Sequence, residues 1–204
     1  MKLLKIVNIL PLAIIALLSV WGWQQQKREA SRFSPVVIGG KASISATDFE
    51  DGVIADPTIN YKQFTVVPNS VHDGDTIRVR SQSGEVLKVR FACIDAPELK
   101  QQFGIESRNH LRSLLNEAGN KVKLNIVDTD RYGRSVAEIW INKGLVQSIQ
   151  TGSGHAFAYD KYAKNCPSWE AVKSSEDYAK RLKLGVWKYP NFVRPWDWRR
   201  MNKN

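Results

Sequence analysis

Residues 73–98 read DGDTIRVRSQSGEVLKVRFACIDAPE, and this stretch decides the fold. Residues 76–80 alternate between apolar and charged side chains, as a half-buried strand does. Gln82-Ser83-Gly84 has the composition of a hairpin turn, and residues 86–94 show the pattern of a second, longer strand. The stretch therefore predicts a β-hairpin with an acidic turn at each end, Asp73-Gly74-Asp75 before it and residues 95–98 after it.

Further strand and helix patterns surround this hairpin. Strands are expected at residues 63–67, 121–127 and 134–141. Helices are expected at about residues 105–118, in a short segment after the turn at 143–144, and at about residues 168–184. Five short strands with helices between and after them indicate an α+β fold, a five-stranded β-barrel of the OB type with about three helices.

The composition points to a polyanionic partner. The 204 residues include 30 Lys and Arg against 20 Asp and Glu, a formal net charge of +10. Such a charge suits nucleic acid or an anionic membrane surface. The two cysteines exclude a disulfide scaffold and a paired-cysteine zinc site. A Cys93–Cys166 bridge and a buried free thiol at Cys93 both remain open.

The amino terminus has the pattern of an export segment. Lys2 and Lys5 precede an apolar run at residues 6–20, and Trp21 and Trp23 follow it. A cleaved signal peptide and an uncleaved membrane anchor both fit residues 1–23. The remainder is expected to be exported, either secreted or anchored to the membrane and facing outside the cytoplasm. Residues 24–61 then form a linker or arm, and residues 62–204 form the folded domain.

Three polar segments carry candidate chemistry: residues 73–76, residues 90–98 and residues 130–134. Each segment alone is also typical of a solvated turn. Together they offer carboxylates for a hard cation such as calcium, which takes oxygen ligands, and a carboxylate left over for a water molecule. They also offer two arginines, whose guanidinium groups suit phosphate. Hydrolysis of a phosphodiester requires this combination.

With these motifs in order, the chain resembles the thermonuclease family, the staphylococcal-nuclease-like domain, in a bacterial exported or membrane-anchored form. The motifs are Asp-Gly-Asp-Thr at 73–76, Arg-x-x-x-x-Asp-x-Pro-Glu at 90–98 and Asp-x-Tyr-Gly-Arg at 130–134. The resemblance covers roughly residues 63–200, including Leu-Gly-Val-Trp at 184–187 and Pro-Trp-Asp-Trp-Arg-Arg at 195–200. Three linked motifs are far more specific than any one of them.

The resemblance implies a calcium site at the two acidic turns. Asp75 and Asp95 would bind Ca²⁺ directly, the backbone carbonyl of Ala96 would be a third ligand, and Asp73 would lie nearby through water. Some relatives carry Thr at position 96, but a backbone ligand depends little on the side chain. Glu98 would orient or deprotonate the attacking water.

The resemblance also implies residues that contact the nucleic acid. Arg90 and Arg134 would stabilise the transition state at the phosphate, and Tyr132 would stack on or flank a base. Tyr159 and Tyr162 match the nucleotide pocket of the family imperfectly. Packing of these two tyrosines between the barrel and the last helix is their other interpretation.

The implied function is calcium-dependent hydrolysis of phosphodiester bonds in DNA and RNA, with little sequence specificity and with 3′-phosphate ends. Monomer is the default oligomeric state, and membrane contact is expected through the amino-terminal segment if that segment is uncleaved. The alternative is a non-catalytic OB-fold nucleic-acid-binding module at the membrane surface. A degenerate module should lack at least one site residue, and this chain has all five: Arg90, Arg134, Asp75, Asp95 and Glu98. A membrane-surface scaffold would leave the acidic residues unexplained.

Overall fold

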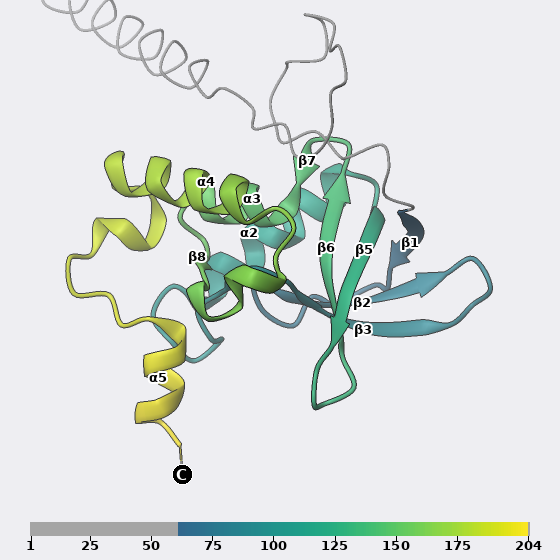
Figure 1. The fold of residues 1–204 in the computed structure, drawn as a ribbon, viewed down its shortest axis with the longest axis horizontal. Helices are drawn as coiled ribbons and strands as arrows, with labels where there is room; N and C mark the ends of the chain where they lie inside the picture. Colours follow the sequence, from purple (N-terminus) through teal and green to yellow (C-terminus); the bar gives the residue numbers. More distant parts are fainter. Residues whose placement is uncertain (1–60, 204) are drawn as a thin grey trace, which may run out of the picture. The chain divides into compact units, whose positions relative to one another are not determined.

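The computed structural model describes residues 61–203 (Figure 1). The expected export segment at 1–23 lies outside the described residues, and so does the expected arm at 24–61 apart from Tyr61. None of the helices in residues 61–203 combines the length and the apolar character needed to cross a bilayer.

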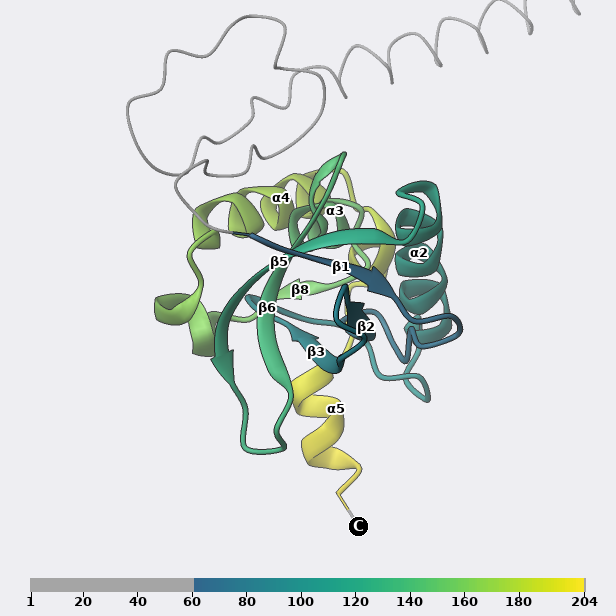
Figure 2. The same ribbon diagram turned by 90° about the vertical axis from the view of Figure 1, so that its right-hand side faces the viewer.

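Five strands form a closed barrel (Figure 2). The order is β3-β2-β1-β5-β6, and a parallel pairing of β3 with β6 closes the ring. The barrel strands are β1 (Lys62–Val66), β2 (Thr76–Ser81), β3 (Val86–Phe91), β5 (Lys121–Thr129) and β6 (Ser135–Ile141). Three two-residue strands accompany them: β7 (Gly144–Leu145), paired with β6, and β4 (Ile94–Asp95), paired with β8 (Phe157–Ala158).

The hairpin predicted from residues 73–98 is confirmed as β2 and β3. The two strands pair antiparallel, with Thr76 opposite Arg90 and Arg80 opposite Val86. Ile77 and Val79 are fully buried, while Arg78 between them is exposed. The alternation predicted from the sequence therefore separates the barrel interior from solvent.

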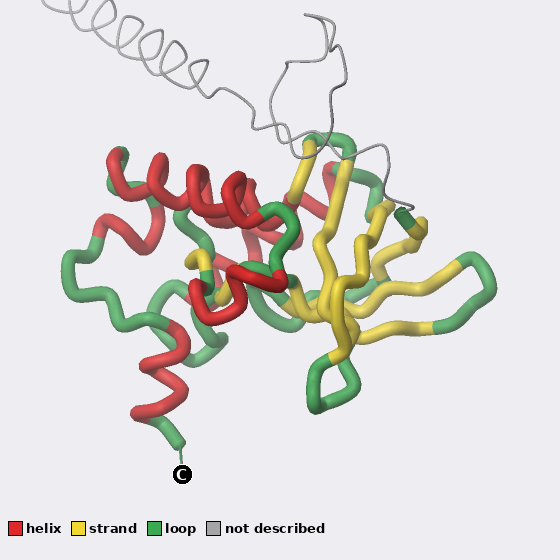
Figure 3. The backbone as a smooth tube through the Cα atoms, viewed as in Figure 1, coloured by secondary structure: helices red, strands yellow, loops and turns green. Residues whose placement is uncertain are grey.

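The helices gather on one side of the strands (Figure 3). The three expected helices are present as α2 (Gly104–Glu117), α3 (Val146–Gly152) and α4 (Trp169–Arg181). Three further elements were not expected: the 3₁₀ turns η2 (Asp160–Asn165) and η3 (Gly185–Lys188), and the helix α5 (Pro195–Met201). Pro195 occupies the first position of α5, where its fixed φ suits a helix start.

Helix α4 ends earlier than the sequence indicates. We expect Gly185 to stop it after Leu184, but Lys183 adopts the left-handed conformation at φ 53° instead. The Leu184 N–H donates to the Ala179 carbonyl and the Lys183 N–H donates to the Lys180 carbonyl, which is the Schellman pattern. Gly185 is instead required in the following turn, where a Cβ would lie 2.1 Å from the Gly154 carbonyl oxygen.

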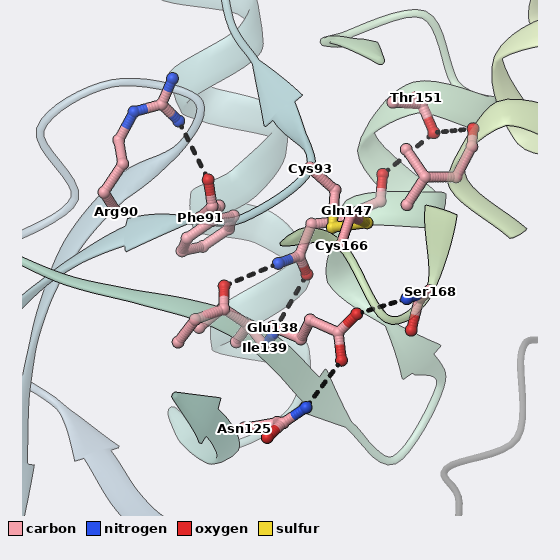
Figure 4. The surroundings of a disulfide bond; sticks show 12 residues. Arg90, Phe91, Cys93, Asn125, Glu138, Ile139, Gln147, Thr151, Cys166 and Ser168 are labelled. Carbon is pink, nitrogen blue, oxygen red and sulfur yellow. Dashed lines mark hydrogen bonds between the residues drawn. A yellow bond between two sulfur atoms is a disulfide. The ribbon is translucent and has the colours of Figure 1, made fainter. Parts of the chain in front are cut away.

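A disulfide joins Cys93 to Cys166, with the two Cα atoms 5.3 Å apart (Figure 4). This bond resolves the alternative left open by the sequence. Cys93 lies between β3 and β4, and Cys166 precedes α4, so the bond ties the barrel to the helices. Beside it the buried Glu138 carboxylate accepts hydrogen bonds from Asn125 Nδ2 at 3.0 Å and from the Ser168 N–H at 2.7 Å.

Candidate active site

Two carboxylates meet at one arginine. Asp75 precedes β2 and is 4% exposed, and Asp95 lies in β4 and is 0% exposed. Arg90, from β3, contacts both: its Nη1 lies 2.7 Å from Asp75 Oδ2, and its Nη2 lies 2.7 Å from Asp95 Oδ1. The two acidic turns flank the hairpin in the sequence, and they meet at its open end because Thr76 pairs with Arg90.

A bend in the backbone brings Asp95 back toward Arg90. Strand β3 ends at Phe91, and Cys93 takes a left-handed φ of 72°. The expected single strand at 86–94 is thus broken into β3 and β4, and β4 pairs with β8 instead of continuing in the barrel. The bend places the Asp95 carboxylate beside the arginine five residues before it.

A backbone N–H and a side-chain hydroxyl fix the Asp75 carboxylate. The Ala96 N–H donates to Asp75 Oδ2 at 2.6 Å, and Thr76 Oγ1 donates to Asp75 Oδ1 at 3.1 Å. Asp73 Oδ1 in turn accepts the Asp75 N–H at 3.1 Å, so Asp73 lies next to the pair without contacting Arg90 directly. Gln150 Nε2 donates to the Gly74 carbonyl at 2.8 Å and holds the turn from the helical side.

Burial dominates the electrostatics of this cluster. Loss of solvent raises the pKa of Asp75 to about 7, although the Arg90 guanidinium acts in the opposite direction. Burial likewise raises the pKa of Asp95. For Arg90, burial opposes the charged form, but attraction from Asp75 and Asp95 outweighs it and raises the pKa. A second cation near the two carboxylates would stabilise their ionised forms.

Helix α5 supplies that second cation, Arg199, which the sequence analysis does not identify. Arg199 Nη2 lies 2.6 Å from Asp95 Oδ2, and Arg199 Nη1 donates to Asp95 Oδ1 at 3.0 Å and to Glu98 Oε1 at 2.7 Å. Burial opposes the charge of Arg199, but its hydrogen bonds to Asp95 and Glu98 raise its pKa. The closing Trp-Asp-Trp-Arg-Arg run offered a signal in the sequence, but the two partners of Arg199 lie 104 and 101 residues away in the chain.

Arg134 directly precedes β6, the strand that pairs with the strand of Arg90, and it has its own partner. Its Nε lies 2.7 Å from Asp130 Oδ2, and its guanidinium carbon lies 5.7 Å from the centre of the Tyr132 ring, which is 68% exposed. Among residues 61–203, no hydrogen bond or ion pair joins Arg134 to Asp75, Asp95 or Glu98. The parallel register puts Val136 opposite Arg90, so strand alternation directs position 134 to the same face as Arg90.

The two candidate tyrosines lie near α5. The Tyr159 N–H donates to the Cys93 carbonyl at 2.9 Å, which places Tyr159 beside the bend before Asp95. Its ring stacks on Trp196 of α5, with centroids 4.9 Å apart and planes 6° apart. Tyr162 contacts Tyr159 edge to face at 5.2 Å and is 49% exposed. Tyr159 therefore packs against α5, a helix that was not expected, and Tyr162, beside Tyr159, is exposed.

The oxygen donors around Asp75 and Asp95 suit a hard cation. Two buried carboxylates and the neighbouring Ala96 carbonyl are ligand types that calcium prefers. Asp75, Asp95 and Glu98 are not a trio of residues whose ligand atoms, one from each residue, all lie within 4.8 Å of one another. Within residues 61–203, the only such trio is Glu138 with Cys93 and Cys166, and those two sulfurs are bonded to each other.

Comparison with known proteins agrees with this geometry. The model of the family "Staphylococcal nuclease homologue" matches residues 88–189, half of the chain. A protein named "Micrococcal nuclease" from Shigella flexneri is 35% identical over 141 residues, covering 65% of this chain and 78% of the relative. An "Uncharacterized endonuclease" of Escherichia coli O157:H7 is 33% identical over 130 residues, covering 63% of this chain and 80% of the relative.

The chain belongs to the staphylococcal nuclease homologue family. A "Probable staphylococcal-like nuclease" of Oryza sativa subsp. japonica is 38% identical over 119 residues, 57% of this chain, but the match spans only 29% of the rice protein. The chain therefore spans less than a third of the length of this rice relative.

Proposed function

We propose that this protein is a calcium-dependent nuclease that hydrolyses phosphodiester bonds of DNA and RNA with little sequence specificity and leaves 3′-phosphate ends. The observation that carries the proposal is the convergence of Asp75 and Asp95 on Arg90, with Glu98 next to them. Family membership and the nuclease names of the relatives support the same reaction.

Asp75, Asp95 and the Ala96 carbonyl would hold the calcium ion, and Asp73 would contact it through water. Asp75 Oδ1 and Asp95 Oδ2 each accept one hydrogen bond among the described residues, and a carboxylate oxygen can accept two. Each acid thus keeps capacity for a further partner. Bound calcium would supply Lewis-acid stabilisation of the phosphate oxygens.

Arg90 and Arg134 both keep N–H donors that could bind a phosphate group. Arg90 uses Nη1 toward the Phe91 carbonyl (Figure 4) and toward Asp75. Its Nη2 contacts Asp95, which leaves its Nε–H without a partner among the described residues. Arg134 uses only Nε, toward Asp130, so both of its terminal nitrogens remain for a ligand. These donors would stabilise the charge that develops on the phosphate, and Glu98 would accept the proton of the attacking water.

Three tyrosines would contact the bases. Tyr132 projects from the turn that also carries Arg134 and is 68% exposed, which suits stacking on an unpaired base. Tyr162 has the second exposed ring. Tyr159 would contribute through its edge, because one of its faces is covered by Trp196.

An exported location fits this activity, because an unspecific nuclease in the cytoplasm would attack the nucleic acid of its own cell. Residues 1–23 would direct the export, as a signal peptide or as a membrane anchor, and the protein would act as a monomer. Fractionation of cells that produce the full chain would test the location. Recovery of the protein in the cytoplasm would contradict it.

The decisive experiment is digestion of a labelled single-stranded oligonucleotide by the full chain, with calcium or with a chelator. We expect cleavage only with calcium, and a loss of at least a hundredfold in turnover for Glu98→Gln or Arg134→Ala, the order that acid–base and charge-stabilising groups contribute. Glu117→Gln, which alters an exposed carboxylate paired with Lys143, is the matched control. Retarded but uncut oligonucleotide in a gel would instead favour the alternative, a nucleic-acid-binding module.

A further inference from the structure

We propose that Arg199 is a positioning residue of the active site: it holds the Glu98 carboxylate in place and makes helix α5 part of the catalytic machinery. The inference rests on the proposed nuclease function and adds a residue to it. Its basis is a chain of contacts that runs Arg90–Asp95–Arg199–Glu98.

Arg199 binds the two acids in different ways. It meets Asp95 with two nitrogens, Nη2 to Oδ2 at 2.6 Å and Nη1 to Oδ1 at 3.0 Å, which is the bidentate geometry that fixes a guanidinium group in orientation. It then offers Nη1 to Glu98 Oε1 at 2.7 Å. Asp95 therefore anchors the guanidinium group, and the guanidinium group orients Glu98.

Glu98 depends on this contact more than Asp95 does. Among the described residues, Arg199 is the only side chain that pairs with the Glu98 carboxylate, whose side chain is 31% exposed. Asp95 is fully buried and has a second partner in Arg90, so we expect it to stay in place without Arg199. Loss of Arg199 would free a solvent-facing glutamate to sample several rotamers, while the acids expected to hold calcium stay in place.

Helix α5 is itself firmly attached, so it can deliver Arg199 precisely. Pro195 is buried, and Trp196 stacks on Tyr159. The Arg194 guanidinium lies 4.3 Å from the Phe157 ring centre and 4.6 Å from that of Trp187. Gln101 Nε2 donates to the Val193 carbonyl at 2.6 Å, which fixes the segment leading into the helix.

The charge balance leaves room for a metal ion beside Arg199. Three carboxylates, on Asp75, Asp95 and Glu98, face two guanidinium groups, so the cluster has an excess of negative charge when all three acids are ionised. Arg199 donates one hydrogen bond to Asp95 Oδ2, and this oxygen can accept a second partner. Arg199 can therefore stay in contact with Glu98 when a cation binds to the acids.

The test compares Arg199→Ala, Arg199→Lys and the matched control Arg200→Ala in the full chain with calcium and an oligonucleotide. Arg200 lies on the same helix, is exposed and, within residues 61–203, pairs only with Asp197, so its loss removes the same charge outside the site. We expect Arg199→Ala to lower kcat by about a hundredfold, the usual cost of a misplaced catalytic group, with little change in KM. Arg199→Lys should recover part of the loss, and Arg200→Ala should cost little.

Two further measurements separate positioning from other roles. In a Glu98→Gln background, Arg199→Ala should cost nothing more, because its effect passes through Glu98. Calcium binding by titration calorimetry, without substrate, should persist in Arg199→Ala, and thermal unfolding should show a folded protein.

An additive loss in the double variant, a loss of calcium binding, or full activity of Arg199→Ala would each overturn the inference. Higher activity of Arg199→Ala at low calcium would also overturn it, because Arg199 would then be a competitor of the metal. In all these cases calcium-dependent cleavage by the unaltered chain would still support the proposed function.

Discussion

The imidazole rings of His110 and His155 lie parallel, with centroids 3.9 Å apart and planes 3° apart. Burial lowers the pKa of both histidines, and the neighbouring His110 helps to lower that of His155 to about 3. The His110 Nδ1 also hydrogen-bonds Gln150 Oε1, and the same amide holds the turn at Gly74 through Nε2. The neutral histidine pair therefore supports the acidic turn at residues 73–75 through the Gln150 side chain.

This pair should make stability fall in mild acid. The unfolded chain titrates its histidines near the ordinary pKa of 6.5, whereas the folded chain resists protonation well below it. The pair's contribution is complete above about pH 6.5, and it shrinks as pH falls toward 3, because the unfolded state binds the protons first. Urea unfolding between pH 7.5 and 5 measures the summed slope, to which each proton contributes at most about 1.4 kcal/mol per pH unit. Asp75, whose pKa burial raises to about 7, gives a slope of the opposite sign in this range, so the histidine part is the difference between the unaltered chain and His155→Gln.

His155→Gln should flatten that slope, while His72→Gln, at an exposed position, should leave it unchanged. An identical slope in the unaltered chain and in His155→Gln would contradict the assignment.

The disulfide should contribute much of the stability of the domain. Cys93 and Cys166 are 73 residues apart, and closing a loop of that length in the unfolded chain is worth about 2–4 kcal/mol. Cys93→Ser with Cys166→Ser, measured by urea unfolding, should lose that amount. Added reductant should then have no further effect on the double variant but should destabilise the unaltered chain. Equal stability with and without the bond would refute this expectation.

Arg90→Lys should be severe although it keeps the charge. A lysine ammonium is a point charge and cannot reach Asp75 and Asp95 at once in the forked geometry of Arg90. We expect turnover to fall by about a hundredfold or more, as when one charge-stabilising group is removed. Arg78→Lys, exposed on the paired strand β2, is the control and should stay near normal activity. Turnover by Arg90→Lys close to that of the control would argue against a phosphate role for Arg90.

Gly104→Ala should disturb both the fold and Glu98. A Cβ at position 104 would lie 1.9 Å from the Glu98 carbonyl oxygen, so the backbone that carries Glu98 would have to shift. We expect a loss of about 1–3 kcal/mol in unfolding free energy, the range for overpacking, together with reduced turnover. Gly152→Ala is the matched control, since its nearest neighbour would be the Ser175 Cβ at 3.5 Å. Equal stability of the two variants would exclude the clash.

Alternation and turn chemistry made the barrel predictable, because each strand has one buried face. The bend at Cys93 was not predictable, because residues 92–94 continue the apolar run and cysteine has no preference for a left-handed φ. Helix α5 was not predicted because its seven residues are too few to show the hydrophobic repeat of a helix.

The candidate site also has residues that the sequence predicts and residues that only the structure shows. The segment motifs pointed to Asp75, Arg90 and Asp95, which the fold does bring together. Arg199 lies 101 residues from Glu98 in the chain, and only the tertiary structure shows that they meet. Arg134 shares a face with Arg90 through the β3–β6 pairing, but the motif could not reveal that Asp130 already holds it.

The bend at Cys93 also limits how the chain length can vary. In an unbroken strand, residues 90 and 95 would point to opposite faces, because they are an odd number of positions apart. The left-handed residue between them cancels that mismatch. Added or deleted residues should therefore be accepted at the exposed tip around Gln82 and Ser83, whereas a single insertion between Phe91 and Asp95 would turn the acid away from its arginine.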